Sequence, residues 1–327
     1  MKASMGSFER NFRLRVIVAF GLVYLLWGST YLAMRVAIEH LPPFVMSAVR
    51  FLISGPVMLA YCALSGRKIS LNWSDAWRLM AIGVLMLSVG NMGVAWAEQY
   101  VPTGLAALIV AIVPIWVAII EAVIFRIARL RPVGILGLAL GAAGVVVLLW
   151  PSLFSGTPVG RAYLTGAGVL AIASFGWAFG SVLSHRWSLK ADVLSACGWE
   201  MVFAGVANTL VAASGGYFQR AVWTARGVGA IAYLVIFGSL IGFTAFIWLL
   251  NHVPPPKVAT YAYVNPVVAV YLGWLVMNEK IDGYMLIGTA VILGAVALVN
   301  SSKLKAEHTL LKMDAERDLT AAKVGAD

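Results

Sequence analysis

Long apolar runs separated by short polar, glycine- or proline-rich segments dominate the chain. A transmembrane helix needs about 20 mostly apolar residues, because each residue advances ~1.5 Å through a hydrocarbon layer of ~30 Å. The fold class that we expect is therefore an all-α membrane protein with ten transmembrane helices. The predicted spans are 16–38, 44–65, 77–97, 103–125, 132–150, 163–185, 194–214, 228–250, 258–277 and 283–301.

The pattern occurs twice along the chain, with the same residue types about 150 positions apart. Six matches share an offset of 152: Gly90, Trp96, Val101, Pro102, Ala107 and Pro114 return as Gly242, Trp248, Val253, Pro254, Ala259 and Pro266. Trp27 and Trp177, and Gly55 and Gly205, are 150 apart. Such self-similarity indicates a duplicated unit. We expect a cytoplasmic N-terminal segment 1–15, a first five-helix repeat 16–150, a second five-helix repeat 163–302 and a cytoplasmic tail 303–327.

Composition and charge agree with this topology. Hydrophobic residues form 61% of the chain and charged residues 12%, about half the charged share of a soluble domain. The net charge of +10 could indicate nucleic acid, but the basic residues lie in short loops and we expect no such partner. With both termini in the cytoplasm, 18 of the 24 lysines and arginines fall in inner segments and four in outer ones, as the positive-inside rule requires.

The odd number of spans in each repeat bears on function. The second five-helix repeat must enter the membrane from the opposite side, which makes the two repeats inverted. Inverted repeats are the architecture of many secondary transporters, whose substrate site lies near the midplane where the copies meet. The sequence therefore predicts a multi-pass secondary transporter that works by alternating access.

Prolines and tryptophans supply candidate pathway residues. Pro114 and Pro266 lie near the middle of spans four and nine, where the missing N–H frees a carbonyl and can kink the helix. For a symmetry-related pair, bending around a shared pathway is favoured over kinks needed only for packing. Trp27 and Trp177 lie mid-span, away from the interfaces where tryptophan gathers, and cavity lining and core packing are equally good interpretations.

Polar side chains within spans extend this candidate pathway. A buried polar group needs a partner, which a hydrated cavity or a neighbouring helix can supply. The cavity is favoured for Asn265, and the choice stays open for Asn91. Trp96 and Trp248 lie nearer span ends, where an aromatic belt is the stronger alternative. The candidate substrate-pathway residues are Trp27, Tyr31, Asn91, Trp96, Pro114, Trp177, Trp248, Tyr261, Asn265 and Pro266.

Charged residues inside spans are rare and often functional. Arg50 and Glu200 are 150 apart, so they should occupy mirrored depths and not pair with each other. Arg50 could pair with Glu39 or Glu98, and Glu200 with the basic segment 126–131. A structural ion pair or snorkelling is favoured for both.

A third charge, Glu121, lies about one turn from the inner end of span four. A local pair with Arg126 or Arg129 is favoured there over a gate or a proton site. No carboxylate or histidine falls clearly at the midplane, so proton coupling is not visible, although protons stay a candidate coupling ion.

Short motifs in both repeats resemble those of the EamA-type permeases of the drug/metabolite transporter superfamily. They are Trp27-Gly28-Ser29-Thr30-Tyr31, Pro42-Pro43-Phe44, Arg50-Phe51, Pro266, the Gly288–Gly294 face, and Asn278-Glu279-Lys280, which is similar to a Gly-Glu-Arg-type motif. The resemblance implies a ten-helix inverted-repeat fold in the bacterial inner (plasma) membrane. It also implies export of small metabolites, commonly amino acids or toxic compounds such as drugs. The first repeat departs from the family with Arg126-Ile127-Ala128-Arg129.

An integral-membrane enzyme acting on a lipid or isoprenoid-linked substrate is the alternative. The four histidines are scattered, and no metal-ligand spacing or phosphate-binding glycine loop is present. We therefore expect no catalytic residues, no metal and no cofactor. The expected partners are a small-molecule substrate and the lipid bilayer, and the chain is expected to be a monomer or a weak homodimer.

Overall fold

The computed structural model describes residues 2–126, 132–154, 158–253, 258, 261–295, 297 and 298. Within them, seven helices are long and apolar enough to cross a membrane. They are Phe12–Ile38, Pro43–Leu64, Trp73–Ala97, Thr103–Ile124, Gly160–Arg186, Val193–Ser214 and Ala225–His252. Three shorter apolar helices are Pro132–Val147, Val264–Met277 and Gly283–Ala295. The protein is thus an all-helical membrane protein, and these helices lie where the apolar runs predict spans.

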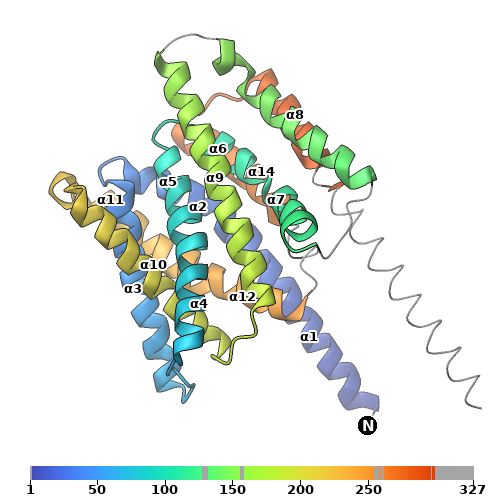
Figure 1. Ribbon diagram of the computed structural model, residues 1–327, viewed down its shortest axis with the longest axis vertical. Helices are drawn as coiled ribbons and strands as arrows, with labels where there is room; N and C mark the ends of the chain where they lie inside the picture. Colours follow the sequence, from blue (N-terminus) through green and yellow to red (C-terminus); the bar gives the residue numbers. More distant parts are fainter. Residues whose placement is uncertain are drawn as a thin grey trace, which may run out of the picture.

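Most of the long helices consist of several segments (Figure 1). In chain order these are α1 (Lys2–Leu22), η1 (Val23–Trp27), α2 (Gly28–Ile38), α3 (Pro43–Leu64), α4 (Trp73–Gly83), η2 (Val84–Met92), α5 (Gly93–Ala97), α6 (Thr103–Val110), α7 (Val113–Ile119), η3 (Ile120–Ile124), α8 (Pro132–Phe154), α9 (Pro158–Arg186), α10 (Val193–Ser214), η4 (Tyr217–Arg220), α11 (Ala225–Tyr233), η5 (Leu234–Phe243), α12 (Thr244–His252) and α14 (Tyr261–Met277). Segments η1, η2, η3 and η5 are π-helical, and η4 is a 3₁₀-helix. The predicted tail 303–327, Pro254 and Arg129 lie outside the described residues.

Side-chain caps explain where several helices begin. Asn72 accepts a hydrogen bond from the Asp75 N–H (2.8 Å) at the start of α4. Asp192 caps α10, and Thr224 caps α11 by accepting from the Gly227 N–H (3.1 Å). Each cap satisfies a backbone donor that the first helical turn leaves without an intrahelical partner.

The backbone repeats with the same offset as the sequence. The π-helical segments η2 and η5 begin 150 residues apart, at Val84 and Leu234. Among the described residues, the non-glycine positions with positive φ are Arg126 (52°) and Asn278 (54°), which are 152 apart. Two unusual local conformations therefore occur at equivalent places in the two halves.

Helices α3 and α10 pack closely against each other. A Cβ added at Gly55 would lie 2.8 Å from the Val202 nitrogen, and one added at Gly205 would lie 2.9 Å from the Leu52 nitrogen. Leu52 and Val202, like the two glycines, are 150 apart, so the contact is reciprocal. A reciprocal contact is what a two-fold relation between two copies produces.

Loops gather at two ends of the helical bundle. At one end, the Val222 N–H donates to the His40 carbonyl (3.0 Å), and Arg226 forms an ion pair with Glu39 (3.4 Å). We call this the Val101 end, which carries loops 39–42, 98–102, 215–224 and 278–282. At the other, Arg67 pairs with Asp192 (2.8 Å). We call that the Arg67 end, which carries loops 65–72 and 187–192.

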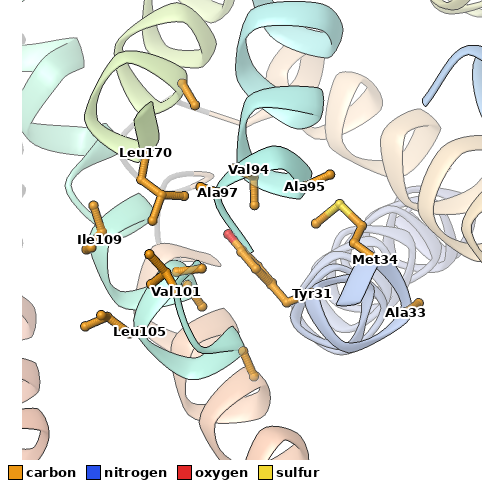
Figure 2. Packing of buried hydrophobic residues seen from close by; sticks show 14 of the residues in the cluster. Tyr31, Ala33, Met34, Val94, Ala95, Ala97, Val101, Leu105, Ile109 and Leu170 are labelled. Atoms are coloured by element: carbon orange, nitrogen blue, oxygen red, sulfur yellow. The ribbon is translucent and has the colours of Figure 1, made fainter. Parts of the chain in front are cut away.

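An apolar cluster fills the bundle toward the Val101 end. Its buried members include Met34, Val94, Val101 and Leu105, and the Tyr31 ring extends from α2 toward Val94 (Figure 2). Val101 is 1% exposed and Leu105 3% exposed. The cluster therefore separates the centre of the bundle from the loops at this end.

The fifth apolar helix packs through small residues. A Cβ at Gly141 would collide with the Ile115 side chain on α7, and one at Gly144 would lie 3.1 Å from the Ile292 nitrogen. Glycines on one helix face let neighbouring membrane helices approach closely. Helix α8 is thereby held against both α7 and the last apolar helix.

Candidate functional site

A cavity of about 70 Å³ lies at the centre of the bundle. Both halves of the chain line it, through η1, α2, α3, η2, α5 and α6 in the first half and α9, α10, η5 and α14 in the second. A space of this size holds a few water molecules. It lies between the two loop-bearing ends, where the apolar pattern places the middle of the spans.

Six of the predicted pathway residues line this cavity: Trp27, Tyr31, Asn91, Trp177, Tyr261 and Asn265. The structure therefore brings together residues that are up to 238 positions apart in the chain, from Trp27 to Asn265. It also shows lining from the second and seventh spans, which the sequence analysis did not include, through Arg50, Phe51 and Met201.

The remaining four predicted pathway residues are not among the cavity-lining residues. Trp96 packs on Tyr100, with ring centroids 4.9 Å apart. Trp248 stacks on His252 at 4.2 Å, in the last turn of α12. Both tryptophans lie near span ends, where the aromatic-belt alternative placed them.

The two prolines act differently from each other. At Pro114 the fourth span is broken, because α6 ends at Val110 and α7 begins at Val113. Proline has no N–H for the carbonyl four residues earlier, that of Val110, and Val110 lines the cavity. Pro266 instead lies inside an uninterrupted α14, directly after the cavity residue Asn265.

Trp27 is the centre of an aromatic cluster on one side of the cavity. Its ring centroid lies 5.4 Å from that of Trp177 and 5.5 Å from that of Tyr261, both in edge-on geometry, and 4.7 Å from that of Phe246. The Trp27 Nε1–H donates to the Gly238 carbonyl on η5 (3.2 Å). Trp27 therefore both lines the cavity and packs between the halves. Edge-on aromatic pairs of this kind are favourable.

Arg50 supplies the charge of the site. Its side chain is 4% exposed; Nε donates to the Ser239 Oγ (2.9 Å) and Nη1 donates to the Asn91 Oδ1 (2.8 Å). For Asn91, the sequence left open a cavity position or a hydrogen bond to a neighbouring helix. Both hold, because Asn91 lines the cavity and accepts a hydrogen bond from Arg50 on α3.

The suggested partners of Arg50 are wrong. Glu39 pairs with Arg226, and the Glu98 carbonyl accepts from Arg35. Among the described residues, no carboxylate lies within 4 Å of the Arg50 guanidinium. The reason is position, because Glu39 and Glu98 lie at the Val101 end while Arg50 reaches inward to η2 and η5.

Two further buried groups lack partners within the described part of the chain. Asn265 is 4% exposed, and its Oδ1 has no hydrogen-bond partner there. Glu200 is 2% exposed, and its Oε2 has no hydrogen-bond partner there. The backbone of Glu200 packs against Gly83 on α4. No described residue forms an ion pair with Glu200, and Arg129 of its suggested basic partner segment lies outside the described residues. Glu121 lies half-buried in η3.

Glu98 lies just beyond the third span and is fully buried, with both carboxylate oxygens unpartnered among the described residues. Burial raises the pKa of the Glu98 carboxyl well above its ordinary value, and the nearby Arg35 charge lowers it in part. Burial disfavours a charged form because it removes water.

Glu279 shows what the Asn278-Glu279-Lys280 motif does here. Its Oε1 accepts from the Thr103 N–H (2.7 Å) and its Oε2 from the Gly104 N–H (3.1 Å). A carboxylate at a helix N-terminus satisfies free donors and opposes the helix dipole. The motif thus ties the loop after α14 to the start of α6. Ile127, the equivalent residue at offset 152, lies outside the described residues.

Sequence reasoning missed Ser239, Gly238 and the role of π-helical segments. Seven lining residues lie on such segments: Trp27, Leu87, Gly90, Asn91, Gly238, Ser239 and Phe243. π-Helical turns occur frequently at functional sites. The signal available in sequence was small residues, Gly90 and Gly238, inside otherwise bulky apolar runs.

Comparison with known proteins bears on what this site does. The profile of the EamA-like transporter family matches residues 14–150 and again residues 164–301. The chain is 37% identical over 282 residues to the uncharacterized inner membrane transporter YedA of Escherichia coli strain K12, covering 86% of this chain and 89% of that protein. It is 25% identical to protein PecM of Dickeya dadantii, over 88% and 92% of the two chains. One protein of known crystal structure shares the fold, with a TM-score of 0.63, 23% identity and coverage of 86% and 95%.

Proposed function

Because the chain belongs to the EamA-like transporter family, we propose that it exports small metabolites across the inner membrane by alternating access around the central cavity. Membership of a transporter family makes it a multi-pass membrane transporter and not the membrane enzyme that the sequence left as an alternative. A transporter of this kind takes a small-molecule substrate and works in the bilayer.

We propose that the two halves are inverted five-helix repeats, at residues 16–150 and 163–302, between a segment 1–15 and a tail 303–327. The reciprocal glycine contacts of α3 and α10 and the equivalent positive-φ residues support a two-fold relation. The distribution of lysine and arginine supports cytoplasmic termini. With this orientation the Val101 end faces outward and the Arg67 end inward.

The observation that carries the proposal is the cavity itself, lined from both halves midway between the two ends. In inverted-repeat transporters the site lies at the repeat interface, and one repeat rocks against the other. Outward opening would part Val94 on α5 and Leu105 on α6, in the first repeat, from Leu170 on α9, in the second, within the apolar cluster of Figure 2.

The substrates that we propose are small metabolites with an apolar or aromatic part, amino acids and drugs among them. The aromatic cluster around Trp27 supports an apolar part. The inner-membrane location follows the relative YedA. Protons are the candidate coupling ion, and we propose a monomer or a weak homodimer.

Counterflow in proteoliposomes tests this function. Vesicles loaded with pools of unlabelled metabolites are followed for entry of labelled tracer, with the wild type, Trp177→Ala and Trp248→Ala. We expect the wild type to exchange one pool. Exchange should fall at least several-fold in Trp177→Ala and stay near the wild-type rate in Trp248→Ala, because Trp177 lines the cavity and Trp248 is not among its lining residues. Absence of exchange over a broad panel by folded, inserted protein would refute the proposal.

A further inference from the structure

We propose that Arg50 is the binding residue for a carboxylate, so that the transported solute is a monocarboxylate with an apolar or aromatic body. This inference rests on the proposed function, because it assigns the substrate class of the same cavity. It is carried by the burial, the bonding and the surroundings of one guanidinium group.

The guanidinium has neutral partners only. Ser239 and Asn91 each accept one of its hydrogen bonds, and no carboxylate of the described residues lies within 4 Å. A buried charge is costly unless it is paired, because neutral hydrogen bonds replace only part of the lost hydration. The group is thus held in place without a counter-charge from the described chain.

Arg50 also has donors to spare. A guanidinium carries five N–H groups in a planar fork, and the two bonds to Ser239 and Asn91 use one on Nε and one on Nη1. Two of the remaining three N–H groups are on Nη2. A Cβ added at Gly238 would lie 2.8 Å from Nη2. Glycine at 238 therefore leaves this side of the fork uncovered by a side chain at the cavity wall.

The lining determines the charge of a suitable solute. Arg50 is the one charged residue among the lining residues that the structure describes. One guanidinium neutralises a monoanion, binds a carboxylate through two parallel hydrogen bonds, and would repel a cation. A phosphate monoester carries close to two negative charges at neutral pH. One of these charges would stay uncompensated, because Arg50 is the one charged residue among the described lining residues.

The rest of the lining fits the body of such a solute. Trp27, Trp177, Phe243 and Tyr261 contribute aromatic surface to the same cavity. Asn265 adds a polar side chain to the same lining. Ligand pockets commonly combine an apolar wall with a few polar groups that orient the ligand.

Matched probes separate charge from shape. Purified full-length protein is melted with 3-phenylpropionate or hexanoate, and with 3-phenylpropionamide or hexanamide, which have the same shape without the charge. We expect the two acids to raise the Tm at concentrations at least tenfold lower than the two amides. An equal response to acid and amide in the wild type overturns the inference, and this comparison needs no variant to fold.

Variants then assign the preference to Arg50. Arg50→Gln should lose the tenfold preference with the amide response unchanged, and Arg50→Lys should keep part of it because the charge remains. Arg226→Gln is the control, because Arg226 is an exposed ion-pair partner at the Val101 end. A preference for acids that persists in folded Arg50→Gln overturns the inference.

Counterflow with the same probes separates this inference from the proposed function. Acid binding that depends on Arg50, without exchange of any solute, supports the carboxylate site and refutes transport. Exchange of the amides as fast as the acids, unaffected by Arg50→Gln, supports transport and overturns the carboxylate site.

Discussion

Individual residues in this protein act mainly by linking helices that are distant in the chain. Arg50 joins α3 to η2 and η5, Trp27 joins η1 to η5, and Glu279 joins the end of α14 to α6. In lipid, backbone and side-chain polar groups must find their partners inside the protein. The few polar side chains of the spans are therefore the ones whose replacement has the most specific effects.

Replacement of Glu279 tests its capping role. In Glu279→Ala the N–H groups of Thr103 and Gly104 lose their acceptor, which should cost about 1–3 kcal/mol of stability. Thermal unfolding in detergent should show a lower Tm than the wild type. Lys280→Ala is the matched control at an exposed neighbour, and an equal loss in both variants would refute the cap.

The pH dependence of stability tests the burial of Glu98. Its folded pKa is raised above the unfolded value, so its contribution to stability is fully present below the unfolded pKa and is lost as pH rises through the folded pKa. Glu98→Gln, which resembles the protonated form, should therefore unfold at a higher temperature than the wild type at pH 8. The gap should shrink as pH falls toward 4, and a gap independent of pH would contradict the burial effect.

At the scale of helices, close packing through glycine sets the distances between spans. Gly205 lies against the Leu52 backbone, so Gly205→Leu should overpack the α3–α10 contact at a cost of about 1–3 kcal/mol or more. Gly168→Leu is the control, because an added Cβ at Gly168 has no atom within 4 Å. The Tm in detergent should fall in the first variant and stay near that of the wild type in the second.

The break in the fourth span is the second feature at this scale. Pro114→Ala restores an N–H for the Val110 carbonyl at the cavity wall, so α6 and α7 can join into one helix. We expect the variant to fold and to exchange solute several-fold more slowly in counterflow. Pro151→Ala is a control, since Pro151 lies inside α8, away from the cavity lining. Unchanged exchange in Pro114→Ala would show that the break has no part in transport.

At the scale of the whole molecule, much of the architecture is readable from sequence because the membrane constrains it strongly. The bilayer thickness fixes span length, so the apolar runs locate the helices. The Trp27–Trp177 match at offset 150 points to residues that do meet at the centre. The same constraint does not determine side-chain partners, which depend on helix rotation and depth.

The partners of Arg50 show this limit. The sequence places Glu39, Glu98 and Arg50 at similar depths in the membrane. The Arg50 guanidinium nevertheless points toward Ser239, which is 189 residues away in the chain. Trp96 and Trp248 match each other in the repeat and still miss the cavity, because both lie near span ends. A repeat identifies equivalent positions, and whether those positions face the axis or the lipid is decided by packing.

Alternating access requires one central cavity to open in turn to the two sides of the membrane. Both native cysteines, Cys62 and Cys197, are buried, so replacing them with serine or alanine gives a background for a single probe at Ser174, which lines the cavity. The decisive measurement is labelling of Ser174→Cys by a membrane-impermeant thiol reagent applied separately to right-side-out and inside-out vesicles. Alternating access predicts labelling from both sides, and labelling from one side only, or from neither, would contradict it.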